Sequence, residues 1–233
     1  MRATAEKAYL KSDLDFLGVP LPVMRQIVGT VKRQHPGLDR PTLLDLVERL
    51  WKPRVFESRM MAVLLLDGFP SLLEPGDIRL LERLIRESKT WAFVDELAIG
   101  ITGRLVERSP ELLATLDRWS TDDDFWIRRS SMLALLPPLR RGGGEFERFA
   151  RYAEGMLEDR EFFIRKAIGW VLRETSKKRP DLVYEWLLPR AGRSSGVTVR
   201  EAVKYLSPEQ RDGVLAAYGS AGRRATVSGR APR

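Results

Sequence analysis

The sequence contains no cysteine and only one histidine, and these two shortages exclude several kinds of functional site. Without cysteine, the chain forms no disulfide and offers no thiolate to a metal ion. His35 alone cannot build a zinc site or complete a serine-histidine catalytic pair. It precedes Pro36 between two expected helices, so we interpret it as a solvated loop residue. Most hydrolase mechanisms are therefore excluded, and neither a metal ion nor another cofactor is expected.

Long uncharged apolar stretches are also missing from the sequence. No segment approaches the roughly 18 residues that a membrane-spanning helix requires, and no signal-peptide pattern opens the chain. We therefore expect a soluble, cytoplasmic protein without a membrane partner. The 233 residues, of which 43% are hydrophobic, are enough to bury a core.

Positive charge exceeds negative charge, and the formal net charge of +8 favours an anionic partner. The last fifteen residues, GSAGRRATVSGRAPR, contain four arginines and no acid, so half of the excess lies there. A segment this rich in glycine, serine and arginine cannot bury enough apolar surface to fold. We therefore predict one folded domain over residues 1–218 and a disordered basic tail over residues 219–233. The tail either adds nonspecific affinity for phosphates or is a simple disordered end.

Helix signals recur along the whole chain, whereas strand patterns are scarce. Four segments begin with an aromatic residue and continue as a mixed basic and apolar helix, and a fifth keeps the pattern without the aromatic. These segments start at Phe56, Trp91, Trp126, Phe163 and Val199. The starts are separated by 35, 35, 37 and 36 residues, which is the period of a two-helix unit. Because stacked helix pairs form a curved solenoid, we predict an all-α fold, a right-handed α-α superhelix.

The segment EFFIRKAIGWVLRE, residues 161–174, predicts a helix with two contrasting faces. One face is an ordinary core-facing stripe. The other collects two aromatic rings, two cations and a glycine, at Phe162, Lys166, Gly169, Trp170 and Arg173. Interleaved aromatic and basic side chains suit a nucleic acid, and the glycine would let a ligand approach the backbone closely. The alternative is a second core face under a neighbouring helix.

A candidate catalytic carboxylate lies on the helix expected to begin at Trp91. At 100° per residue, Asp95 projects on the same side of this helix as Trp91. The alternative role for this aspartate is to compensate the helix macrodipole. A carboxylate among basic and aromatic side chains could cleave a bond between sugar and base, because it stabilises an oxocarbenium-like state and orients a water. A base alkylated at a ring nitrogen is already cationic, so no second carboxyl group is needed to protonate it before it leaves. The nearby cations expected to hold phosphates are Arg129, Lys166 and Arg173.

The sequence resembles the bacterial DNA alkylation repair family of AlkD-type glycosylases. The resemblance runs from about Lys11 to Leu206 and is carried by KSDLDFLGVP, TWAFVDEL, FWIRRSSML, EFFIRKAIGWVLRE and VREAVKYL. It implies a HEAT-like repeat solenoid. It also implies an enzyme that excises cationic N3- and N7-alkylpurines from duplex DNA without a metal ion and leaves an abasic site. Unlike most glycosylases, such an enzyme does not flip the damaged nucleotide into a pocket.

The resemblance further implies roles for individual residues. Asp95 would be the catalytic carboxylate, with Trp91 and Trp170 against the deoxyribose. Arg129 would contact the backbone at the site. The remaining DNA-binding surface would include Arg25, Phe162, Phe163, Lys166 and Arg173. The sequence departs from the family pattern before Lys11, where the first helix is largely missing, at Pro20 and at Pro137. Asp95 is at none of these places.

Two other interpretations of the sequence remain open. Helical solenoids are mostly scaffolds, so the chain could be a non-enzymatic helical-repeat module that binds DNA structure or a protein partner. The pair of Trp91 and Asp95 favours the enzyme, because a scaffold needs neither residue. RNA binding is less favoured, since no stacking platform is present. No oligomerisation signal is found, so we expect a monomer.

Overall fold

The computed structural model describes residues 2–228 of the chain, and side chains as far as residue 220. Apart from an isolated bridge between Asp15 and Val55, this part of the chain contains no β-structure, so the all-α prediction is confirmed. The sequence predicted one domain over residues 1–218, whereas the helices gather into two compact units, Met1–Thr115 and Leu116–Arg233. None of the described helices combines the length and the apolar character needed to span a membrane.

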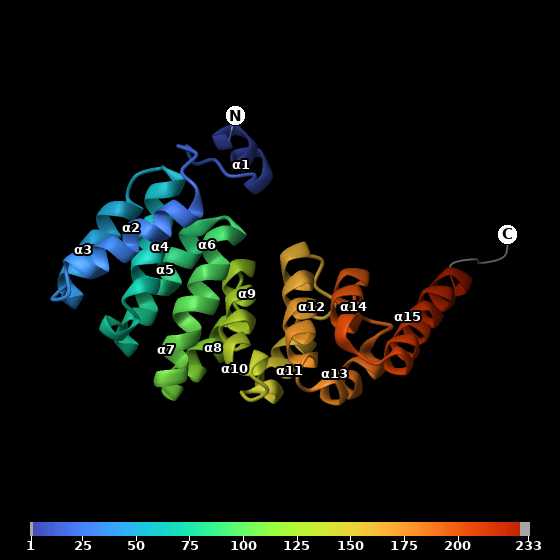
Figure 1. Ribbon diagram of the computed structural model, residues 1–233. Coiled ribbons are helices and arrows are strands. Elements are labelled where there is room, and N and C mark those ends of the chain that lie inside the picture. The colour runs from blue at the N-terminus through green and yellow to red at the C-terminus, as the bar shows by residue number, and fades with distance from the viewer. Residues whose placement is uncertain (1, 229–233) are drawn as a thin grey trace. The chain divides into compact units, whose positions relative to one another are not determined.

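The first unit holds the helices that precede Leu116 (Figure 1). They are α1 (Arg2–Leu10), α2 (Leu21–Gln34), α3 (Arg40–Trp51), α4 (Phe56–Gly68), η1 (Pro70–Leu72), η2 (Pro75–Asp77), α5 (Ile78–Ser88), α6 (Trp91–Asp95), η3 (Glu96–Thr102), α7 (Gly103–Arg108) and η4 (Pro110–Leu112). The division between the units falls within α8 (Leu113–Trp119).

The second unit holds the helices that follow α8. They are α9 (Phe125–Ala134), α10 (Leu136–Arg140), α11 (Phe146–Gly155), α12 (Phe162–Ser176), α13 (Pro180–Leu187), η5 (Leu188–Arg190), α14 (Gly196–Ala202), η6 (Val203–Tyr205) and α15 (Pro208–Ser228). The five predicted repeat helices begin at or within three residues of the expected starts, at Phe56, Trp91, Phe125, Phe162 and Gly196.

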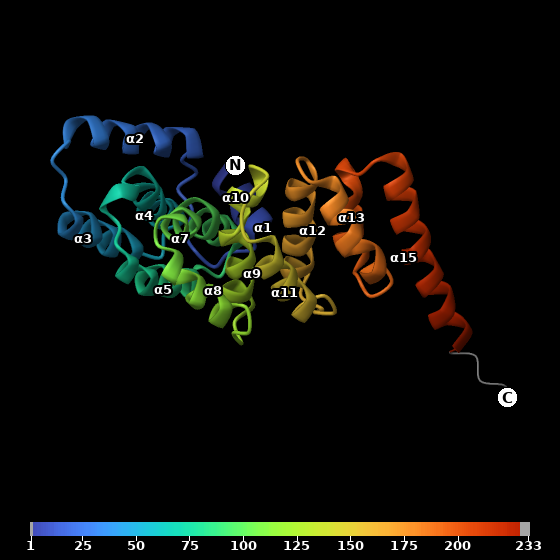
Figure 2. The ribbon, with the colours of Figure 1, turned by 90° about the horizontal axis from the view of Figure 1, so that it is seen from below.

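The helices of each unit alternate between two rows. In the first unit, α4 packs against both α2 and α3 (Figure 2), and α5 packs against α6 and η3. In the second unit, α12 packs against α9 and α14, and also against α13. We call α2, α4, α6, α9, α12 and α14 the second helices, and α3, α5, α8, α11 and α13 the first helices. The predicted helix pairs are therefore present in both units.

Helix starts follow the sequence signals in part. Asp39 caps α3, because its side chain accepts a hydrogen bond of 3.0 Å from the backbone N–H of Thr42. Thr90 occupies the N-cap position of α6, but its side chain makes no capping hydrogen bond. His35 is the exposed C-cap residue of α2, which confirms its assignment to a loop.

A buried glutamate holds the FLGVP turn that joins α1 to α2. The Glu57 carboxylate on α4 accepts hydrogen bonds from the backbone N–H groups of Leu17 at 2.9 Å, Gly18 at 2.6 Å and Val19 at 3.2 Å. Gly18 has a φ of +82°, a conformation that side chains other than glycine rarely adopt. This carboxylate therefore fixes the entry into α2, where Arg25 lies.

Gly169 permits close packing between two helices of the second unit. A Cβ atom at this position would lie 2.9 Å from the Cβ of Glu201 and 3.0 Å from the carbonyl oxygen of Thr198, both on α14. Gly169 thus permits the close approach to the backbone that the sequence predicted, and the element that approaches is α14. On this part of α12 the alternative interpretation, a face under a neighbouring helix, is correct.

The predicted basic tail coincides with the end of the last helix. α15 runs to Ser228, so the backbone of residues 219–228 is helical. Residues 229–233, with Arg230 and Arg233, lie outside the described residues. The role of this segment in phosphate binding stays a prediction.

Candidate functional site

Asp95 occupies a repeat position at which the other repeats bury their side chains. The equivalent residues, four positions after each predicted repeat start, are Met60, Ser130, Ala167 and Val203, and all four are buried. Asp95 is only half-buried. A carboxylate placed wholly in the core would lose its hydration, whereas a half-buried one keeps contact with water. Asp95 therefore lies at the surface of the second helices of the first unit, as the catalytic hypothesis requires.

Trp91 begins α6 and is also half-buried. The Tyr9 ring on α1 meets it edge-on, with 5.9 Å between ring centroids. On the core side of α6, Phe93 lies 4.8 Å from Phe56 and 5.7 Å from Trp51. These buried rings anchor α6, so the indole and the carboxylate are carried by a helix that is fixed from behind.

A second carboxylate, Glu96, follows Asp95 and pairs with an arginine that the resemblance assigned to DNA binding. Arg25 Nη2 lies 3.1 Å from Glu96 Oε1. Burial raises the pKa of Glu96; Arg25 opposes this effect, and the carboxylates of Asp67 and Asp95 add to it. Arg25 keeps about half of its side chain exposed and remains accessible to a phosphate. The TWAFVDEL motif contains Glu96, but the sequence analysis gave it no role.

The backbone changes from α-helix to π-helix directly after Asp95. α6 ends at this residue, and η3 (Glu96–Thr102) is a π-helix. A π-helical turn holds more residues than an α-helical turn, so the side chains after Asp95 are displaced around the axis from their positions at 100° per residue. Such segments often occur at functional sites. The periodicity of the sequence gave no sign of it.

Arg129 is buried in the second unit, with 2% of its surface exposed. Its Nη1 donates a hydrogen bond of 2.6 Å to the carbonyl oxygen of Phe163. Its guanidinium lies 5.8 Å from the Phe163 ring centroid and 6.0 Å from that of Trp170. A buried guanidinium keeps its charge and needs such acceptors and ring faces. Arg129 therefore joins α9 to α12 beneath Trp170, and its contact with a DNA phosphate stays a prediction.

The start of α12 presents accessible aromatic and basic side chains. Phe162 is 50% exposed, and the Nζ of the exposed Lys166 lies 5.8 Å from its ring centroid. Phe163 is half-buried and packs 4.8 Å from Trp126. Among the described residues, no carboxylate is paired with Lys166. This end of α12 therefore presents an exposed ring and an exposed cation, and its contact with a nucleic acid stays a prediction.

Arg173 lies further along α12 and is held by two carboxylates. Its Nη1 donates to Glu201, and its Nη2 donates to Glu174 Oε1 at 3.2 Å. The sequence analysis treated this arginine as a cation directed at phosphate. The structure shows that it also links α12 to α14, because Glu201 belongs to α14.

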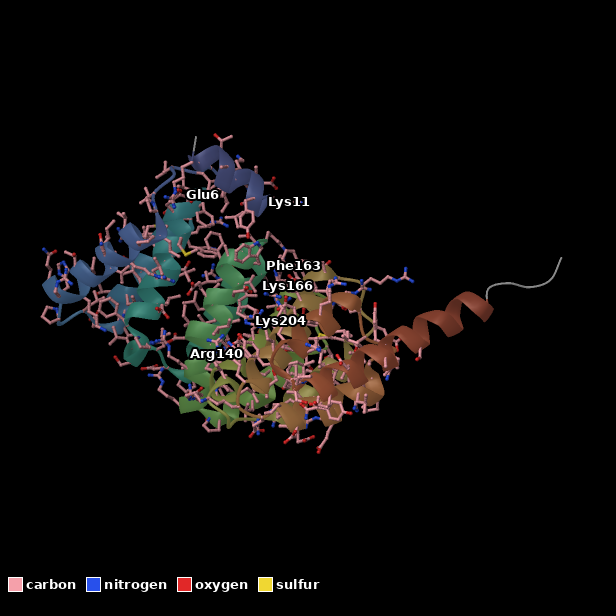
Figure 3. The ribbon with its side chains drawn as sticks, turned by 45° about the vertical axis from the view of Figure 1, so that its right-hand side comes forward. Glu6, Lys11, Arg140, Phe163, Lys166 and Lys204 are labelled. Atoms are coloured by element: carbon pink, nitrogen blue, oxygen red, sulfur yellow. The ribbon has the colours of Figure 1, made fainter. Side chains whose placement is uncertain are left out.

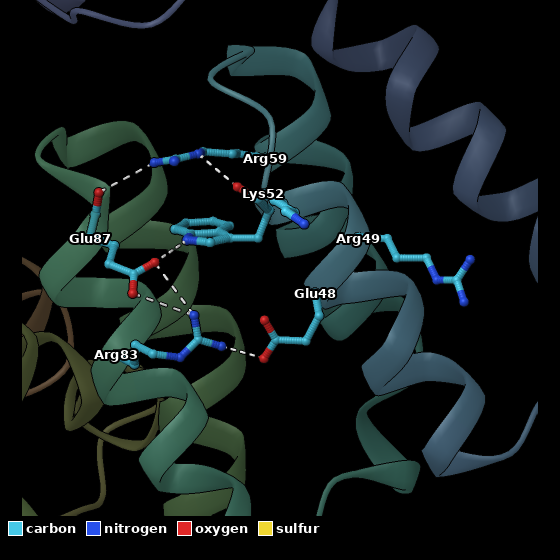
Figure 4. A pocket seen from close by; sticks show the side chains of 7 residues that line it. Glu48, Arg49, Lys52, Arg59, Arg83 and Glu87 are labelled. Carbon is cyan, nitrogen blue, oxygen red and sulfur yellow. Dashed lines mark hydrogen bonds and ion pairs between the residues drawn. The ribbon is translucent and has the colours of Figure 1, made fainter.

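A cavity of about 380 Å³ lies among α3, α4 and α5 of the first unit (Figure 4). Arg59 lies 5.1 Å from the Trp51 ring centroid and donates to the Trp51 carbonyl oxygen at 3.0 Å. Glu87 accepts a hydrogen bond of 2.6 Å from the Trp51 indole. Neither Trp91 nor Asp95 lines this cavity. Arg59, at the repeat position that corresponds to Arg129, is thus occupied by contacts within the protein.

The predicted site residues divide between the two units. Trp91, Asp95 and Arg25 lie in the first unit, and the structure brings Arg25 to the residue next to Asp95. The other predicted residues lie in the second unit. Arg129 contacts Phe163 and Trp170, Phe162 contacts Phe163 and Lys166, and Arg173 is held by Glu174 and Glu201. No group of metal-ligating side chains that could hold an ion occurs within the described part of the chain.

The fold defines the class of protein. It is similar to that of a protein from Enterococcus faecalis described as a predicted DNA alkylation repair enzyme, at 22% identity and a TM-score of 0.80 over 89% of this chain and 95% of that chain. AlkD2 from Streptococcus mutans is 20% identical, with a TM-score of 0.63 over 88% of this chain and 99% of that chain. The smu.31 protein from Streptococcus mutans UA159 is also 20% identical, with a TM-score of 0.59 over 79% of this chain and 100% of that chain. The fold is therefore the all-α helical-repeat fold of AlkD-type proteins.

The family model described as DNA alkylation repair enzyme matches residues 1–206. This chain belongs to that family, which gives it a role in the repair of alkylated DNA and makes DNA its partner. No match is found among curated proteins.

Proposed function

We propose that this protein is a DNA glycosylase that hydrolyses the N-glycosidic bond of cationic N3- and N7-alkylpurines in duplex DNA and leaves an abasic site, without flipping the damaged nucleotide. Asp95 is the proposed catalytic carboxylate. The observation that carries the proposal is its half-buried position on the same short helix as Trp91, where four equivalent repeat positions hold buried residues.

The chemistry requires a single carboxylate. As the bond between sugar and base lengthens, positive charge develops on the deoxyribose, and a nearby carboxylate stabilises this charge and orients an attacking water. The alkylated base is already cationic and leaves as a neutral base, so it needs no proton from a general acid. The Trp91 ring face attracts positive charge and contacts the sugar.

The second unit supplies the proposed contacts to the DNA. Trp170 is the second indole against the deoxyribose, and Arg129 supports it from the core side. Phe162, Phe163 and Lys166 contact the DNA at the start of α12, and Arg25 in the first unit contacts a phosphate. The exposed ring of Phe162, the exposed Lys166 and the half-exposed side chain of Arg25 support these roles, because phosphate contacts position a protein on DNA.

The reaction can be tested by comparing a duplex that contains a cationic lesion with one that contains a neutral lesion. The purified protein is incubated with methylated duplex DNA and with a matched duplex that contains hypoxanthine, and free base is measured. We expect release of 7-methylguanine or 3-methyladenine and no release of hypoxanthine, which would need protonation to leave. If both bases are retained while the duplex is still bound, the protein is a non-enzymatic DNA-binding module.

A further inference from the structure

A cluster of charged side chains gathers around the buried carboxylate of Glu174 in the second unit. We call it the Glu174 cluster: Arg140, Arg173, Glu174, Lys177, Glu201 and Lys204. Glu174 lies on α12 and is 5% exposed. Arg140 Nε lies 3.1 Å from its Oε2, Lys177 Nζ lies 2.9 Å from the same oxygen, and Arg173 donates to its Oε1. Three cations therefore share one buried carboxylate.

The second carboxylate of the cluster extends it to α14. Glu201 accepts hydrogen bonds from Arg173 and, at 2.7 Å, from Lys204 Nζ. Four cations thus surround two carboxylates. The cations keep between 26% and 48% of their side-chain surface exposed, whereas Glu174 is almost covered. The excess of positive charge consequently faces solvent.

Ion pairs between the end of α11 and the segment around η5, in the same unit, are balanced instead. Arg190 and Arg193 pair with Glu154 and Glu158, two cations with two carboxylates. An ion-pair network that only stabilises the fold needs one cation for each carboxylate, because one cation neutralises one carboxylate. The additional cations of the Glu174 cluster repel one another, so this arrangement favours a bound anion.

An exposed aromatic ring adjoins the cluster. Tyr205 is 52% exposed, and Lys177 Nζ lies 4.9 Å from its ring centroid. Figure 3 labels Phe163, Lys166, Lys204 and Arg140, all of which belong to the second unit. Cations interleaved with exposed rings suit a sugar-phosphate backbone better than a small anion. Lys177 follows Lys166 by eleven residues, or about 16 Å at the rise of an α-helix.

We propose that the Glu174 cluster binds backbone phosphates of duplex DNA several nucleotides away from the position contacted by Lys166. The buried carboxylate holds Arg140, Arg173 and Lys177 in place before DNA arrives, which reduces the side-chain entropy lost on binding. Arg173 is therefore part of this second contact and does not bind next to the lesion. The inference rests on the proposed function only in taking duplex DNA as the ligand.

The proposal is tested with undamaged duplex DNA, so the result does not depend on base excision. Binding is measured by fluorescence anisotropy across a salt series for the wild type, for Arg140→Ala/Lys177→Ala, and for the matched control Arg190→Ala/Arg193→Ala at η5. Each lost phosphate contact reduces the slope of log K against log salt by about 0.9. We expect a reduction of about 1.8 in the cluster variant and none in the control.

A single variant tests the proposal even if the double variant does not fold. Lys204→Gln removes a cation that bonds only to Glu201 and leaves Glu174 with its partners. We expect its slope to fall by about 0.9 with an unchanged melting temperature. An unchanged slope in both cluster variants would overturn the proposal and leave the cluster to another polyanion, such as an acidic protein. An equal reduction of the slope in the cluster and control variants would overturn the proposal as well, because DNA binding would then depend on the net charge of the protein and not on a phosphate contact at the cluster.

Discussion

The helices α6 and α12 begin at equivalent repeat positions, yet they present opposite chemistry. α6 carries an indole and the carboxylate of Asp95 and is followed directly by Glu96 in η3, whereas α12 carries rings and cations and ends in the Glu174 cluster. Both helices bury the same kind of apolar stripe. The difference teaches that the repeat sets the fold, and that a few positions outside the core give each helix its own chemistry, which we propose to be catalysis for α6 and DNA binding for α12.

Removal of Arg129 would test whether the second unit depends on buried cations as well as exposed ones. Arg129→Ala leaves the carbonyl oxygen of Phe163 without its donor and opens a cavity beneath Trp170. We expect a loss of about 3 kcal/mol in the free energy of unfolding, measured with urea. The exposed Arg160→Ala is the control and should change stability by less than about 0.5 kcal/mol. A fully stable Arg129→Ala protein would show that this guanidinium does not support the cluster of rings.

The packing of α12 on α14 can be tested separately from its charges. Gly169→Ala places a methyl group within 2.9 Å of Glu201 Cβ and should destabilise the fold by about 1–3 kcal/mol. Gly29→Ala on α2 is the matched control, because its nearest neighbour would lie at 3.5 Å. It should stabilise the protein by about 0.5–1 kcal/mol. Equal melting temperatures for the two variants would contradict the close approach of α14.

Lys166→Ala should weaken DNA binding while changing the stability of the fold less than the variants above. Lys166 contacts Phe162 and is exposed, so stability should change by less than about 0.5 kcal/mol. The slope of log K against log salt should fall by about 0.9. Arg151→Ala, an exposed arginine on α11, should leave the slope unchanged. A Lys166→Ala protein with the slope of the wild type would show that the start of α12 faces away from DNA.

Much of the fold could be predicted because similar residues recur in the sequence at the period of the helical repeat. The starts of α4, α6, α9 and α12 follow from aromatic residues that recur every two helices, and Asp39 caps α3 as its side chain suggests. The grouping of the helices into two units does not follow from this period.

The candidate site was predicted less completely, because its details depend on contacts between repeats. Gly169 meets the backbone of α14, and Arg129 turns towards Phe163; neither partner is near in the sequence. The pairing of Arg25 with Glu96 joins residues 71 positions apart. The π-helix after Asp95 breaks the regular rotation on which the analysis of helix faces relied.

The most direct test of the account compares the adjacent carboxylates of the first unit. Asp95→Asn and Glu96→Gln each remove one negative charge at neighbouring positions, and excision of 7-methylguanine is followed in single turnover at saturating protein. We predict that Asp95→Asn lowers the rate by about 100-fold or more while binding undamaged duplex as the wild type does, and that Glu96→Gln stays within a few-fold. Equal rates for Asp95→Asn and the wild type would contradict the assignment of catalysis to α6.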